Sequence, residues 1–162
     1  MAGCGRHGEN TCRWRVSDGK KHRRDPMSSA TRIHHVALVV NDLDEALEFW
    51  RDGLGLKVAS VEDVPDQRAT VAFLSAGDQE LELVKPTDEH SGTARYLQEH
   101  GPGMHHICLE VDDLAESLEH LRSMEVELIN DEPIVGAGGK LIAFIHPRST
   151  HGVLVELCES IA

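Results

Sequence analysis

The chain has 162 residues, the length of one ordinary domain, and 40% of them are hydrophobic, which is enough for a buried core. Its formal net charge of −12 makes it a poor partner for nucleic acid or an anionic membrane, and no apolar run is long enough to span a bilayer. We therefore expect a globular protein with a small-molecule partner and with no nucleic-acid or membrane partner.

The N-terminal residues differ from the rest in composition. Residues 1–31 are rich in Gly, Arg, Lys, Ser and His and have almost no apolar periodicity. Residues 1–32 carry eight Lys/Arg against three Asp/Glu, a net of +5, and residues 33–162 carry eight against twenty-five, a net of −17. Such a polar segment buries too little apolar surface to fold. We predict a disordered extension over 1–31, dispensable at least to residue 26, and one folded domain over 32–162.

The cysteines do not form a disulfide framework. Cys4 and Cys12 lie in the polar extension, whereas Cys108 and Cys158 lie in predicted strands. This usage suits a reducing compartment, and the extension lacks the apolar segment of a secretory signal. We predict a cytoplasmic location, with the mitochondrial matrix as the alternative if the chain is eukaryotic.

The first folded unit covers residues 33–87. A strand over 33–40 leads to a helix that starts at Asp42 with a capping-box-like pattern and ends at Gly53 and Gly55. Its apolar stripe follows the helical period and consists of Leu43, Ala46, Leu47 and Trp50. Three further strands are predicted over 56–62, 69–76 and 79–85.

A second unit covers residues 104–158 and is joined to the first by a short predicted helix over 91–100. It runs the same course: a strand over 104–111, a helix from Asp113, and strands near 125–130, 140–146 and 152–158. Because one such unit cannot cover both faces of its sheet, two units should pair around a cavity. The predicted class is α+β, with two tandem βαβββ modules forming an eight-stranded half-open barrel around a metal site.

The two units are copies of each other. Ile33–Leu38 matches Met104–Leu109, with an offset of 71 residues (106 − 35), and Leu81–Leu83 matches Val155–Leu157. Each copy carries a pair of histidines near its start and a glutamate near its end. A repeat of this kind builds a four-ligand metal site from two half-sites.

Strand alternation selects one histidine from each pair, because neighbouring strand residues point to opposite faces. His35 and His106 each share a face with a small residue, which leaves room for a ligand. We therefore assign these two histidines to the cavity and expect His34 and His105 to face the packed side.

The same alternation places Glu82 and Glu156 opposite the packing residues of their strands. A buried carboxylate is costly unless it is paired or bound to a metal. Taken singly, each histidine is better explained as a satisfied core residue, and each glutamate as a solvent-facing residue on an edge strand. Together, His35, Glu82, His106 and Glu156 repeat in register and predict a site for a divalent ion, Co²⁺ first, with Zn²⁺, Mn²⁺ or Ni²⁺ as alternatives.

The repeats resemble the vicinal oxygen chelate superfamily, which includes the glyoxalases, over about residues 32–158. Within it the chain looks most like the methylmalonyl-CoA epimerase family. The motifs that carry this likeness are Gly103–Ile107, Asp131–Pro133, Gly136–Lys140, Phe144–Ser149 and Gly152–Leu157.

This resemblance implies interconversion of (R)- and (S)-methylmalonyl-CoA by removal and return of the C2 proton through a metal-stabilised enolate. It implies metal ligands at His35, His106 and Glu156, with glutamine or glutamate at the position of Glu82. It also implies an acyl-CoA substrate and a homodimer.

Epimerisation needs a base on each side of C2. Glu156 is one candidate. Some family members carry the other base at a position that falls near Ala72, which cannot accept a proton. Glu82, or else Glu62, is the substitute that we expect. For the negatively charged substrate, Lys140 and Arg148 are the expected binding residues.

Three alternatives use the same fold. A glyoxalase I-type lyase acting on a thiol hemithioacetal fits the ligand set, but its usual Asp-Pro-[Asp/Asn]-Gly turn is replaced here by His146–Ser149. An Fe(II) extradiol dioxygenase needs an open position that Glu82 would fill. A metal-free binding protein would not need four polar ligands in register.

Overall fold

The computed structural model describes residues 29–160, so most of the predicted N-terminal extension lies outside the described residues. The first strand, β1, spans Ala30–Val39 and therefore begins three residues before the expected start. No helix within residues 29–160 is long and apolar enough to cross a membrane.

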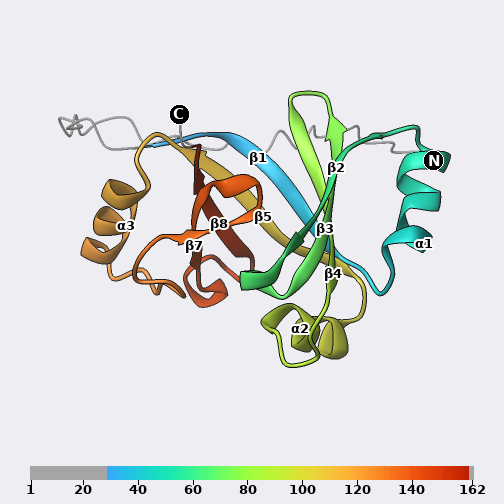
Figure 1. The fold of residues 1–162 in the computed structure, drawn as a ribbon. Coiled ribbons are helices and arrows are strands. Elements are labelled where there is room, and N and C mark those ends of the chain that lie inside the picture. Colours follow the sequence, from blue (N-terminus) through green and yellow to red (C-terminus); the bar gives the residue numbers. More distant parts are fainter. Residues whose placement is uncertain (1–28, 161–162) are drawn as a thin grey trace, which may run out of the picture.

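The first module follows the predicted order of elements (Figure 1). After β1 come α1 (Leu43–Leu47), η1 (Glu48–Gly53), β2 (Lys57–Val64), η2 (Pro65–Gln67), β3 (Ala69–Ala76) and β4 (Gln79–Pro86). Asp42 caps α1, and its carboxylate accepts hydrogen bonds from the backbone N–H groups of Asp44 and Glu45. The predicted single helix changes after Leu47 into the π-helical turn η1.

The second module repeats this course after a linking helix. Its elements are α2 (Gly92–His100), β5 (Gly103–Val111), α3 (Leu114–Ser123), β6 (Ile134–Val135), η3 (Ala137–Gly139), β7 (Leu141–Ile145), η4 (Pro147–Ser149) and β8 (Leu154–Glu159). Ser91 caps α2 and Asp113 caps α3, each through a side-chain oxygen. The predicted linking helix over 91–100 is confirmed.

The strand predicted near residues 125–130 is wrong. This segment forms only an isolated bridge, between Leu128 and Ile145, and the two-residue strand β6 comes later. The physical reason lies at Asn130, whose side-chain oxygen accepts the hydrogen bond of the Phe144 N–H at 3.1 Å. A side chain thus takes the place of a strand carbonyl, and regular pairing does not extend.

All eight strands form one curled sheet in the order β2-β3-β4-β1-β5-β8-β7-β6. The antiparallel pair β1–β5, which we call the central seam, joins the modules. On either side of it, β1 pairs parallel with β4, and β5 pairs parallel with β8. The two halves therefore match across the seam, and the predicted half-open barrel of two βαβββ modules is confirmed.

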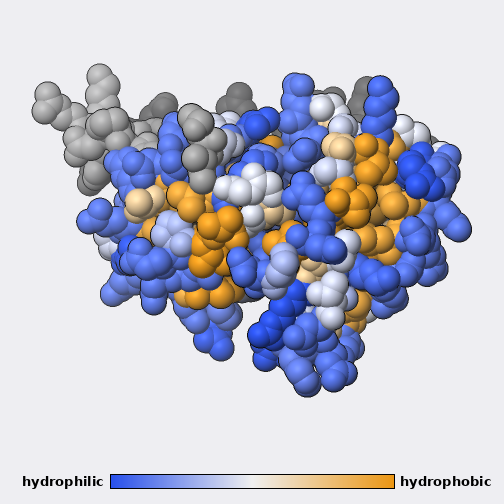
Figure 2. Space-filling view, viewed as in Figure 1, coloured by the Kyte–Doolittle hydropathy of each residue, from blue (hydrophilic) through white to orange (hydrophobic). Residues whose placement is uncertain are grey.

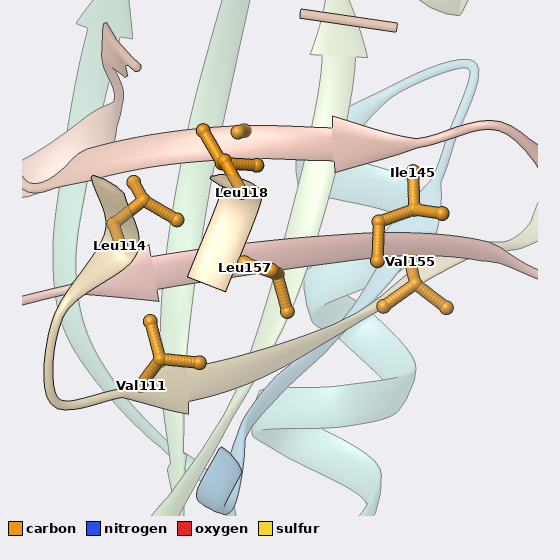
Figure 3. Close-up of a cluster of buried hydrophobic side chains, with 7 residues drawn as sticks. Val111, Leu114, Leu118, Ile145, Val155 and Leu157 are labelled. Carbon is orange, nitrogen blue, oxygen red and sulfur yellow. The ribbon is translucent and has the colours of Figure 1, made fainter. Parts of the chain in front are cut away.

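Each module packs its own helix against the outer face of the sheet, and α1 and α3 lie at opposite ends of the molecule (Figure 1). Under α3, Leu114 and Leu118 pack on Val111, Val155 and Leu157 (Figure 3). The cluster under α1 has equivalent members: Leu43, Leu47, Ala72, Leu74 and Leu83. Helix α2 projects from the sheet at the bottom of the view and has a mostly hydrophilic surface (Figure 2).

The packing under α1 bears on the position near Ala72, where some family members carry the second base. Ala72 is fully buried against the leucines of α1, so it faces the helix and not the barrel interior. Its neighbours Val71 and Phe73 point the other way, into the interior cluster with Ala37 and Val84. Ala72 itself is therefore not placed to be a catalytic base, and its interior-facing neighbours Val71 and Phe73 have no side chain that accepts a proton.

Candidate metal centre

Two β-bulges in the central seam shape the site. Ile33 pairs with Leu109, and His35 pairs with Cys108, so His34 is an extra residue in β1. Further along, Ala37 pairs with His106 and Leu38 pairs with Met104, so the histidine between them in β5 is extra there. At a bulge the regular alternation of side chains fails and a side chain is re-aimed.

The bulges overturn the prediction that His34 and His105 face the packed side. His34 Nδ1 lies 3.0 Å from His35 Nδ1, and His105 Nδ1 lies 2.9 Å from His106 Nδ1. Both members of each pair therefore turn to the inside of the barrel. Two adjacent polar residues in a strand that is otherwise apolar were the available signal for a bulge.

The structure brings the four predicted ligands together. His35 Nε2 lies 3.1 Å from His106 Nε2 and 3.2 Å from a carboxylate oxygen of Glu82. His106 Nε2 lies 3.1 Å from a carboxylate oxygen of Glu156 and 3.7 Å from that of Glu82. All four residues are only 5 or 6% exposed.

Donor atoms of His35, Glu82 and His106 lie within 4.8 Å of one another and fit one ion, and Glu156, with an oxygen 3.1 Å from His106 Nε2, is the fourth candidate ligand. With bonds of about 2.1 Å, adjacent ligand atoms around an octahedral ion lie about 3.0 Å apart. The donor set also fits, because imidazole nitrogen and carboxylate oxygen suit borderline divalent ions. Two carboxylates balance the charge of such an ion, which offsets part of the cost of burying them together.

The histidines and glutamates of the site stabilise one another's charged forms. Burial alone would raise the pKa of Glu156, but the hydrogen bond and charge of His106 hold that pKa below its usual value. Burial would lower the pKa of His35, yet the hydrogen bond and charge of Glu82 raise it above its usual value. Without a metal the cluster thus holds Glu156 ionised and favours a proton on His35.

The outer histidines belong to a second layer around the ligands. Burial, together with the charge of Lys140, lowers the pKa of His34, and Lys140 Nζ lies 2.7 Å from His34 Nε2. Burial, with the charge of His106, lowers the pKa of His105 to about 4. Both outer rings are therefore neutral near neutral pH and can orient the ligand rings through Nδ1.

A cleft of about 430 Å³ opens directly beside the ligands. Glu82 and His106 lie in it, and much of the remaining lining is apolar or aromatic, including Tyr96, Phe144 and Leu154. Its size suits a small ligand or the reactive end of a larger one. A hollow of about 510 Å³ near Val36 and Leu81 contains none of the four ligands, so we place the substrate in the cleft.

The other predicted site residues occupy different environments. Arg148 is 77% exposed in its side chain and lies 3.4 Å from Glu127, on the turn whose Pro147 lines the cleft. Lys140 lines a small inner cavity with Glu82 and Glu156. Glu62 accepts hydrogen bonds from Ser60 and from the N–H of Gly138, so both of its oxygens are engaged.

Comparison with known proteins gives the family. A sequence model of the Glyoxalase/Bleomycin resistance protein/Dioxygenase superfamily matches residues 34–144. The mitochondrial methylmalonyl-CoA epimerase of Mus musculus is 38% identical over 133 residues, which are 82% of this chain and 75% of the relative. This chain belongs to the methylmalonyl-CoA epimerase family.

Further members of this family agree in sequence and in structure. The ethylmalonyl-CoA/methylmalonyl-CoA epimerase of Cereibacter sphaeroides is 38% identical over 128 residues, 78% of this chain and 96% of the relative. A solved methylmalonyl-CoA epimerase in complex with methylmalonyl-CoA and NH4+ is 36% identical, with a TM-score of 0.80 over 83% of this chain and 97% of that chain. The likeness to the epimerase family inferred from the sequence motifs is confirmed.

Proposed function

We propose that this protein interconverts the (R) and (S) epimers of methylmalonyl-CoA and requires a divalent ion held by His35, Glu82, His106 and Glu156. One observation carries the proposal: two histidines and two glutamates from the two repeats converge at ligand separations of 3.1 to 3.7 Å. The cleft beside them and the family membership supply the substrate class.

The bound ion would supply positive charge against the negative charge that develops on the thioester oxygen when C2 loses its proton. The protein's own part is to hold the substrate and to move that proton. C2 lies between a thioester carbonyl and a carboxylate, so its C–H electrons can pass onto the thioester oxygen. A protein base takes the proton, and a protein acid returns one to the opposite face of C2.

Glu156 and Glu82 are the residues that we assign to these two roles. Glu156 is on β8 and Glu82 is on β4, so the carboxylates approach the site from opposite modules. The lowered pKa of Glu156 leaves it ionised and able to accept a proton near neutral pH. Because both oxygens of Glu62 are already engaged, we give Glu62 a role in holding the Gly138 loop.

The cationic residues are assigned by their positions. We place Lys140 near the substrate carboxylate, because it lines the inner cavity together with Glu82 and Glu156. We place Arg148 at the phosphates of coenzyme A, because its side chain is exposed on the turn at the edge of the cleft. The preference for Co²⁺, a homodimeric state and a cytoplasmic location stay predictions.

The test follows the C2 proton directly. The protein is incubated with Co²⁺ and (S)-methylmalonyl-CoA in D₂O, and deuterium at C2 and conversion to the R epimer are measured by NMR. We expect both, and we expect a chelator to stop both. Absence of exchange at saturating Co²⁺ would exclude the epimerase, and turnover of methylglyoxal with glutathione in a parallel assay would favour a glyoxalase.

A further inference from the structure

Three buried side chains that are not proposed bases or metal ligands lie together beside the metal centre. Cys108 is fully buried, Cys158 is 1% exposed and His34 is 6% exposed. One ligand atom from each lies within 4.8 Å of the other two. Both cysteines are free thiols. None of these three groups is a proposed base or metal ligand of the epimerisation, although His34 lies in the second layer around the ligands.

Strand pairing explains why the groups meet. β5 and β8 are parallel, and Cys108 pairs with Glu156, so Cys158 lies two residues further along β8 on the same face. The bulge in β1 turns His34 to this face as well. Three strands of the barrel thus each present one nitrogen or sulfur donor to one point.

We infer that His34, Cys108 and Cys158 form a second cation site, selective for thiophilic ions such as Zn²⁺ or Cd²⁺. Zinc bound by sulfur at about 2.3 Å and by nitrogen at about 2.1 Å places tetrahedral ligand atoms about 3.5–3.8 Å apart, within the observed limit. Two sulfur donors favour a softer ion than the four nitrogen and oxygen donors next to them. The two neighbouring sites therefore differ in the ions that they select.

No residue is assigned as a ligand of both sites, although Cys108 Sγ lies within 4.8 Å of ligand atoms of His35 and Glu156 in the first site. His34 Nδ1 lies 3.0 Å from Nδ1 of His35, whose Nε2 faces the first site. Two thiolates balance the charge of one divalent ion, as two carboxylates do in the first site, so both sites can be filled without strong repulsion.

An approach to this site exists apart from the substrate cleft. A polar hollow of about 200 Å³ is lined by His34 and Lys140 together with Arg32, Asp78 and Glu80. It contains neither Glu82 nor His106 among its lining residues, whereas the cleft contains both. A cation can therefore reach His34 while the cleft is occupied, and in binding Nε2 it would displace the Lys140 ammonium, which lies 2.7 Å from that atom.

The test uses the fact that the chain has four cysteines. In the full chain, Cys4→Ser and Cys12→Ser leave Cys108 and Cys158 as the only thiols. This background protein is reduced with a phosphine and titrated with Cd²⁺. We expect two equivalents to bind, and the second to produce the near-ultraviolet charge-transfer absorption of cadmium thiolates. Cys158→Ala in the same background should abolish that absorption and leave one equivalent.

A second measurement does not depend on whether the alanine variant folds. Zinc X-ray absorption of the background protein, loaded with two equivalents, should show sulfur scatterers at the distance of zinc–thiolate bonds. The inference fails if saturating Cd²⁺ gives no charge-transfer absorption, if the absorption survives Cys158→Ala, or if zinc has no sulfur neighbours. None of these readouts measures epimerisation, so this inference and the proposed function can fail separately.

Discussion

The Nε2 atoms of His35 and His106 lie 3.1 Å apart, although the two residues are 71 positions apart in the chain. They meet because the central seam pairs His35 with Cys108 and Ala37 with His106, which makes the histidines diagonal neighbours. Each module supplies one histidine and one glutamate. The site is therefore complete only where the modules are paired.

Exchanging each glutamate for glutamine should separate the two proton-transfer roles. Both Glu82→Gln and Glu156→Gln should slow interconversion of the epimers by about 10²–10⁴-fold, the usual contribution of a general acid or base. Each variant should still exchange the C2 proton of one epimer, and the two variants should differ in which epimer that is. NMR in D₂O, starting from each pure epimer, measures this.

Full interconversion by Glu82→Gln would contradict the role of Glu82 as the second base and would leave it as a metal ligand only. Glu80→Gln is the matched control. Glu80 lies on the same strand but pairs with Ser75 and lines the polar hollow away from the cleft, so that variant should keep normal rates.

Removing one imidazole should weaken metal binding strongly. His106 Nε2 lies within 3.7 Å of three other donor atoms, so His106→Ala removes the most central ligand. Removing a residue that only hydrogen-bonds to a metal ligand weakens metal binding about 10–100-fold. Removing the ligand His106 itself should weaken metal binding by more than about 100-fold. Calorimetric titration with Co²⁺ checks this. His90→Ala, at a side chain 81% exposed, should bind as wild type does.

The metal-free protein should lose stability in mild acid through His105. Its pKa is about 4 in the fold against a usual value of 6.5, so the unfolded chain takes up the proton first as the pH falls. The contribution of His105 is therefore complete above pH 6.5 and declines down to about pH 4, by up to about 3 kcal/mol.

Urea unfolding between these pH values, with and without His105→Gln, measures that contribution. The variant should show a flatter decline than wild type, whereas His90→Gln should leave the decline unchanged. Comparing variants cancels the opposite contribution of His35, whose raised pKa favours the fold at the acid end. An unchanged decline in His105→Gln would show that this ring is not the titrating group.

The loop that leads to Lys140 should not tolerate a side chain at Gly136. A Cβ atom there would lie 2.8 and 2.9 Å from two side-chain carbons of Ile142, which is buried. Gly136→Ala should destabilise the protein by about 1–3 kcal/mol, as other overpacked sites do. At Gly92 a Cβ would meet nothing within 4 Å, so Gly92→Ala should be neutral in the same urea experiment. Equal effects would show that the loop simply moves.

The repeat allowed much of the architecture to be predicted. Two copies of one pattern fix the same elements twice, and the pairing of a histidine with a glutamate in each copy indicated which side chains should meet. The boundaries of β3 and of the linking helix agreed within one residue because glycines and a capping serine mark them.

The failures all involve interactions that a local pattern does not contain. Strand alternation assigned His34 and His105 to the wrong face, because a bulge depends on how β1 and β5 pair. The segment near 125–130 has strand-like composition, but the Asn130 side chain replaces a ladder bond. The motif alignment that put the family's second base near Ala72 does not give the direction of a side chain, and only the packing against α1 showed that Ala72 faces away from the barrel interior.

The symmetry of the central seam bears on how such a protein can arise. Each half contributes the same two donor types, and β1 and β5 meet as antiparallel equivalents. A single ancestral module that paired with an identical copy of itself through this seam would already surround an ion with four protein donors. Fusion of two such genes would then free each half to diverge while each kept its own histidine and glutamate.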